Sequence, residues 1–233
     1  MQRSHCTLPL RRTDTVNCIL NLNPRLAQFL SVIFHPLLMP TYLFALLLYV
    51  APGRLNVDTY STGARLSVLV LLFLGTFALP ALLIFYLHRV GFLRDMTMPE
   101  QTDRRVPYLL TGLVYTGVTY LFAFRMSLFS ATSPGVGVLL GSITLSILLV
   151  GLINQFWKIS AHSVGMGGVL GAVATLLAKY GDTDLFLPLV ALIALSGLLA
   201  SARLQLNAHT LAQVAVGLGL GVFVSGAAVI WLV

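Results

Sequence analysis

The feature that most constrains this chain is a series of long apolar runs separated by short polar connections. A helix of about 20 apolar residues is long enough to cross the hydrocarbon core of a bilayer. Because hydrocarbon offers the backbone no hydrogen-bond partners, each crossing segment must satisfy its polar groups internally, as a helix does. The runs that meet this description cover residues 27–50, 64–87, 107–125, 136–157, 162–179, 185–202 and 209–232.

The composition supports the same class of protein. Of the 233 residues, 58% are hydrophobic and 9% are charged, whereas a soluble domain carries about 25% charged residues. We therefore expect an all-α, polytopic transmembrane bundle of six to seven helices, a multi-pass protein of a bacterial inner membrane. Residues 1–26 form a basic N-terminal segment, and residues 27–233 form the membrane-integral domain. Since the first run contains Pro36 and Pro40, it should bend or begin at the interface.

The formal net charge of +7 does not indicate nucleic-acid binding. The cations are spread through short loops, and no basic patch with interleaved aromatic residues is present. A protein that faces anionic headgroups or phosphorylated lipids accounts for the charge more simply. The expected partners are membrane lipids and a phosphorylated lipid substrate, and the oligomeric state is left open.

Three polar stretches interrupt the apolar pattern, at residues 102–107, 158–163 and 201–213. An even number of crossings separates each stretch from the next, so all three are expected at the same membrane face. Together they supply cations, histidines and hydrogen-bonding groups that could meet in one site. These candidates are Arg104, Arg105, Lys158, Ser160, His162, Arg203, His209 and Gln213.

This combination of residues suits a phosphate group. His162 stands at the start of an apolar helix, where unpaired backbone N–H groups favour an anion. Gln213 follows His209 by one helical turn and lies on the same face, within reach of its side chain. Arginine and lysine add the fixed positive charge that phosphate oxygens prefer.

The carboxylates lie elsewhere in the sequence. None stands inside an apolar run or beside either histidine. Because two-metal phosphate hydrolysis needs clustered carboxylates to hold the ions, the sequence favours a site without metal or cofactor. Such a route needs a side-chain nucleophile, and histidine is the best candidate.

The three stretches resemble the motifs of the type 2 phosphatidic acid phosphatases, which are membrane relatives of vanadium haloperoxidases. That family carries K-x6-R-P, then P-S-G-H, then S-R-x5-H-x3-D. The third motif matches in spacing from Arg203 through His209 to Gln213, and the second matches as residues 159–162, Ile-Ser-Ala-His. The first is represented by residues 105–107, Arg-Val-Pro, with Met98 at the lysine position. The likeness spans about residues 94–221.

The resemblance implies a mechanism. His209 would attack phosphorus to form a phosphohistidine, and His162 would protonate the departing lipid alkoxide. The cations Arg105 and Arg203, with Lys158 or Arg104, would hold the phosphate oxygens, and Ser160 would complete the site. The family has an aspartate where this chain has Gln213, and that aspartate orients the nucleophilic histidine and stabilises its positive charge.

Two functions therefore stay open at this point. The first is a membrane-integral, metal-independent lipid phosphatase that acts on a phosphomonoester or pyrophosphate lipid. The second is a catalytically weakened or inactive protein of the same fold that binds or transports a lipid phosphate, a reading that Gln213 favours.

Simpler roles are also open for several residues. Ser160 is a common N-cap residue, Arg104 and Lys158 could contact headgroups, and His35 could bond backbone groups freed by the neighbouring prolines. The patterns Gly167-x3-Gly171 and Gly217-x3-Gly221 predict close packing of the two helices that carry His162 and His209.

Overall fold

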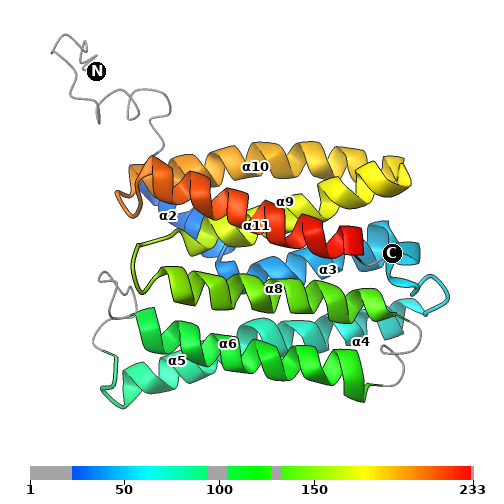
Figure 1. Ribbon diagram of the computed structural model, residues 1–233, viewed down its shortest axis with the longest axis horizontal. Helices are drawn as coiled ribbons and strands as arrows, with labels where there is room; N and C mark the ends of the chain where they lie inside the picture. Colours follow the sequence, from blue (N-terminus) through cyan, green and yellow to red (C-terminus); the bar gives the residue numbers. More distant parts are fainter. Residues whose placement is uncertain (1–22, 94–103, 127–132, 232–233) are drawn as a thin grey trace, which may run out of the picture.

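The computed structural model describes residues 23–93, 104–126 and 133–231 (Figure 1). Over these residues the structure is helical, and seven spans are long and apolar enough to cross a membrane. The prediction of an all-α polytopic bundle is confirmed, at the upper end of the predicted number of helices. Some positions considered above lie outside the described residues: residues 1–22, Met98 and the remainder of residues 94–103.

Each of the first three spans is built from more than one helical element. The first, Pro24–Val50, joins α2 (Pro24–Ile33), the single turn η1 (Pro36–Leu38) and α3 (Met39–Val50). The second, Thr62–Arg89, joins α4 (Thr62–Phe73), the π-helical turn η3 (Leu74–Ala78) and α5 (Leu79–Arg89). The third joins α6 (Arg105–Tyr120) and η5 (Leu121–Arg125), and η2 (Pro52–Leu55) lies between the first two spans.

The other four spans contain one long helix each. They are α8 (Pro134–Ile153), α9 (Ala161–Tyr180), α10 (Phe186–Gln205, preceded by η6, Thr183–Leu185) and α11 (Leu211–Trp231). Most boundaries lie within about three residues of the prediction, and two differences affect the site or its neighbourhood. The helix expected to reach residue 157 ends at Ile153, and the one expected to begin at residue 209 begins at Leu211, so His209 precedes the helix. The predicted runs were too long at these two ends because they included apolar and histidine residues that belong to the connections and not to the helices.

The first span breaks where the sequence reads His-Pro. The residue before a proline is disfavoured in helical conformation, and His35 has extended backbone angles, φ −61° and ψ 137°. Consequently α2 ends at Ile33 and α3 resumes at Met39. The predicted bend is confirmed.

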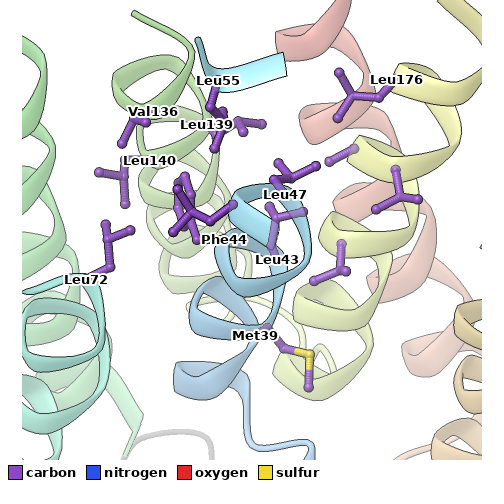
Figure 2. Close-up of a cluster of buried hydrophobic side chains, with 14 of the residues drawn as sticks. Met39, Leu43, Phe44, Leu47, Leu55, Leu72, Val136, Leu139, Leu140 and Leu176 are labelled. Atoms are coloured by element: carbon purple, nitrogen blue, oxygen red, sulfur yellow. The ribbon is translucent and has the colours of Figure 1, made fainter. Parts of the chain in front are cut away.

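Helix α3 lies at the centre of the bundle. Its residues Leu43, Phe44 and Leu47 are at most 1% exposed. Figure 2 shows these side chains surrounded by Leu72 of α4, by Leu139 and Leu140 of α8, and by Leu176 of α9. In contrast, α10 carries large exposed apolar side chains such as Leu187 (76%), as expected of a helix that faces lipid.

Helices α9 and α11 pack backbone against backbone. A Cβ atom added to Gly221 would lie 2.2 Å from the carbonyl oxygen of Val164, and one added to Gly167 would lie 2.2 Å from that of Leu218. Only glycine allows this approach, so the predicted close packing is confirmed. The contact continues to the ends of the helices, where the backbone N–H of Ser160 faces the carbonyl oxygen of Gln213 at 3.4 Å. The residues that precede the two helices are thereby held together.

Candidate functional site

A cavity of about 270 Å³ opens at the end of the bundle where α6, α9 and α11 begin and α10 ends. In Figure 1 this end lies at the left. The three polar stretches do converge there, as the parity of the crossings predicts, because each contributes to the lining. The charged and histidine residues of the lining are His35, Arg104, His162, Arg203 and His209.

His209 is 8% exposed and is oriented by Gln213. Its Nδ1 lies 3.1 Å from Gln213 Oε1, and the same oxygen accepts the backbone N–H of Thr210 at 3.2 Å. Since a backbone N–H can only donate, the shared atom is the amide oxygen, and His209 must donate to it from Nδ1. The neutral ring therefore has no hydrogen on Nε2, as a histidine nucleophile requires.

The contact between Thr210 and Gln213 also explains why the glutamine points this way. The backbone N–H of Gln213 donates to Thr210 Oγ1 at 3.4 Å, while the Gln213 side chain accepts from the Thr210 N–H. This reciprocal pair is a capping box at the start of α11. The sequence contains its signature, Thr210-x-x-Gln213, which could have been used to predict the orientation of the amide.

Burial and positive charge keep His209 neutral. Burial first, and then the nearby cations Arg203, Arg104 and Lys158, lower the pKa of His209 to about 4, although the bond to Gln213 partly opposes the shift. The pKa of Lys158 is also lowered, by burial first and then by the charges of Arg104 and Arg203. An anion bound among these groups would relieve the repulsion.

His162 lies in the first turn of α9 and lines the cavity. Its Nε2 is 3.0 Å from the carbonyl oxygen of Ser31. Because a carbonyl can only accept, His162 carries a hydrogen on Nε2, which leaves Nδ1 as the nitrogen able to exchange a proton in the cavity.

Arg203, in the last turn of α10, brings its guanidinium group to the same cavity. Its Nη1 donates to Ser31 Oγ at 3.1 Å, whereas its buried Nε has no hydrogen-bond partner. A buried N–H without a partner costs about 1–3 kcal/mol. A phosphate oxygen in the cavity could satisfy it.

The two neighbouring arginines of the first polar stretch differ in their position relative to the cavity. Arg104 lines the cavity and interacts with the side chain of Tyr108, whereas Arg105 is exposed and does not line it. The arginine that corresponds to the family's R-P motif therefore points elsewhere, and its neighbour occupies the site.

Ser160 and Lys158 lie beside the cavity but not in its lining. Ser160 is fully buried and caps α9, with its Oγ accepting the backbone N–H of Ser163 at 3.4 Å and the Ser163 hydroxyl at 2.9 Å. The structure thus gives Ser160 the capping role that was left open. Lys158 is half-buried and contributes charge.

His35 was not included among the predicted site residues, yet it lines the cavity. Its ring lies against that of His162, with centroids 5.9 Å apart and planes at 78°. Its Nδ1 accepts the backbone N–H of Leu37 at 3.3 Å, which is the backbone contact considered for it. The His-Pro break inside an apolar run was the available signal.

The described carboxylates lie far from this cavity. Asp58, Asp182 and Asp184 belong to the connections at the opposite end of the bundle, where Asp182 forms an ion pair with Arg54. Within the described ranges, no group of three or more histidine, cysteine or acidic residues is placed to hold a metal ion. The cavity therefore combines cations and imidazoles.

The rest of the lining is mostly apolar. It extends from the polar end along α3, α8 and α9, through Met39, Leu43, Ile143, Ile147 and Val169. An occupant that fits both parts has an anionic end and a hydrocarbon chain.

Comparison of the chain with protein-family models, with curated proteins and with solved structures finds no match. The functional argument therefore rests on the motifs and on the geometry of the cavity.

Proposed function

We propose that this protein is a membrane-integral lipid phosphatase that hydrolyses a phosphomonoester or pyrophosphate lipid without a metal ion. The observation that carries the proposal is the pairing in one cavity of His209, with Nε2 unprotonated, and Arg203, with a buried N–H lacking a partner. A nucleophile and an anion-binding group then face the same space. Residence in a bacterial inner membrane is part of the proposal.

The proposed reaction has two steps. A phosphomonoester monoanion transfers its proton to His162 Nδ1, and His209 Nε2 attacks phosphorus while His162 returns the proton to the departing alkoxide oxygen. Water then attacks the phosphohistidine and gives a proton to His162, and His162 returns this proton to the phosphate as it leaves as the H2PO4− ion. Arg104 and Arg203 hold the oxygens over which charge spreads in the transition state.

Gln213 supports the first step without supplying charge. Its oxygen fixes the reactive tautomer of His209, but it stabilises the positive ring less than a carboxylate would. In a serine-protease triad, replacing the orienting aspartate by asparagine lowers turnover about 10⁴-fold. In the protease, most of that loss arises because the asparagine holds the histidine in the wrong tautomer. In this protein the capping box keeps His209 in the reactive tautomer. We therefore expect slow but genuine turnover.

The experiment is phosphate release by the purified protein in detergent with EDTA, on a panel of phosphatidic acid, phosphatidylglycerol phosphate and polyprenyl pyrophosphate. We expect release from at least one lipid and none from the His209→Ala variant. His88→Ala is the matched control, since His88 lies in the last turn of α5, at the same end of the bundle, but does not line the cavity.

One observation favours a second function. Because Gln213 is explained by the capping box alone, the site could bind a lipid phosphate for transport without reacting. Absence of release from every lipid, together with phosphate binding that requires Arg203, would support this binder and reject the enzyme.

A further inference from the structure

The break in the first span leaves a backbone carbonyl free near the site. In a continuous helix the carbonyl of Ser31 would accept the N–H of His35. Here the His35 N–H instead donates to the carbonyl of Val32 at 3.3 Å. The carbonyl of Ser31 is therefore one of the unsatisfied groups at the end of α2, and His162 Nε2 donates to it at 3.0 Å.

The side chain of the same serine makes a second contact. Its hydroxyl donates to the carbonyl of Ala27 at 2.9 Å, which leaves the oxygen lone pairs available as acceptors. Arg203 Nη1 donates to this oxygen at 3.1 Å. Ser31 is 7% exposed, so water does not readily replace it in either contact.

We propose that Ser31 is a positioning residue of the site, an inference that rests on the proposed function. Its carbonyl fixes the ring of His162 and leaves Nδ1 to face the cavity, and its hydroxyl fixes the guanidinium of Arg203. Ser31 does not line the cavity, and it belongs to none of the three motif stretches. It acts through two residues that come from α9 and α10.

The consequence for Arg203 is specific. With Nη1 held by Ser31, the guanidinium presents its unpartnered Nε in one orientation. Without the hydroxyl, the group loses this anchor and must be ordered when the anion binds. A hydrogen bond to a charged group contributes enough for its loss to weaken anion binding about tenfold.

Inorganic phosphate is the probe for the test. Its Kd for the purified full chain is measured by calorimetry, and its inhibition constant is measured in the phosphatase assay. We expect Ser31→Ala to weaken phosphate binding about tenfold and to lower kcat/KM by a similar factor. Ser31→Cys, which keeps the volume but accepts hydrogen bonds weakly, should do the same if the alanine variant does not fold.

Ser196→Ala is the matched control. Ser196 is 8% exposed and donates to the carbonyl of Leu192 at 2.7 Å, so it has the same kind of back-bond as Ser31 without touching the site. Both alanine variants should fold, and Ser31→Ala should melt at the lower temperature because it leaves Arg203 Nη1 without its partner. Only Ser31→Ala should weaken phosphate binding.

A double-mutant cycle shows whether Ser31 acts through Arg203. In an Arg203→Gln background, Ser31→Ala should add less than about a twofold loss, because the partner is already gone. Additive losses, or equal effects of Ser31→Ala and Ser196→Ala on phosphate binding, would overturn the inference. If the wild type binds phosphate but releases none from lipids, the proposed function fails while the binding data still decide the role of Ser31. A wild type that does neither would overturn both.

Discussion

Replacing Gln213 by glutamate tests the nucleophile most sharply. Glutamate has the length of glutamine, so it can keep both the capping contact to Thr210 and the contact to His209 Nδ1, at 3.2 and 3.1 Å. The change therefore adds a negative charge next to the ring and leaves the rest of the geometry in place. The phosphohistidine and the transition state before it carry positive charge on His209, which glutamate should stabilise.

The magnitude follows from the distance. Opposite charges about 4 Å apart attract by about 4 kcal/mol at an effective dielectric constant of about 20. Burial of the new carboxylate offsets part of this. If about 2 kcal/mol remains, kcat rises about 30-fold.

The same substitution has a signature in the pH profile. Reaction requires neutral His209, whose pKa is about 4 because burial and neighbouring cations disfavour the imidazolium. Wild-type kcat/KM should therefore stay high as pH falls and drop only near pH 4. Glutamate favours the charged ring, so the acid limb should move to higher pH, by about 1.5 pH units for 2 kcal/mol.

The assay is phosphate release from lipid micelles between pH 3.5 and 8, with the thermal stability of each variant measured alongside. A lower rate in Gln213→Glu with unchanged stability, or an acid limb that does not move, would refute the role assigned to the pair of His209 and Gln213.

Three further predictions follow from the structure, and two of them use matched variants. Arg104→Gln should lower kcat/KM about tenfold or more, because it removes a cation from the cavity, whereas Arg105→Gln should change kcat/KM by less than about twofold. Steady-state kinetics with one lipid measures both variants. A larger loss in Arg105→Gln would contradict the placement of Arg104 in the site. Gly221→Ala should destabilise the protein by about 1–3 kcal/mol, because the new Cβ would meet a backbone oxygen. Gly219→Ala should not destabilise it, because position 219 has open space around it. Thermal unfolding in detergent measures both variants, and equal melting temperatures would refute the packing argument. Arg54→Ala should cost less than about 1 kcal/mol, because its ion pair with Asp182 remains partly accessible to water, and it should leave turnover unchanged. A change in kcat would contradict the separation of the two ends of the bundle.

Much of the fold could be predicted because a lipid bilayer allows few backbone conformations and requires apolar side chains on the surface that faces it. Apolar runs of sufficient length must be helices, and the alternation of crossings places distant loops at one face. The prolines at positions 36 and 40 and the paired Gly-x3-Gly patterns predicted the bend and the packing of α9 with α11. All of these are local patterns with a direct physical meaning.

The site could be predicted only in part, because some of its contacts depend on tertiary packing. Arg104 and Arg105 are adjacent, and which one faces the cavity depends on the starting register of α6, which the R-P spacing does not reveal. Ser31 reaches the site because α2 packs against α10, and His35 reaches it because the following turn η1 packs against α9. The sequence of α2 contains Arg25, Gln28 and Ser31, and nothing in it indicates which helix Ser31 faces.

The central claim is that His209 attacks the phosphate of a lipid bound in this cavity. The most direct test is to trap the phosphohistidine. The protein is incubated briefly with a ³²P-labelled lipid phosphate and EDTA, and the reaction is quenched in acid or in alkali. We predict label that is stable in alkali and labile in acid, mapped to the peptide containing His209 and absent from His209→Ala. Turnover without such label, or label on another residue, would contradict the account.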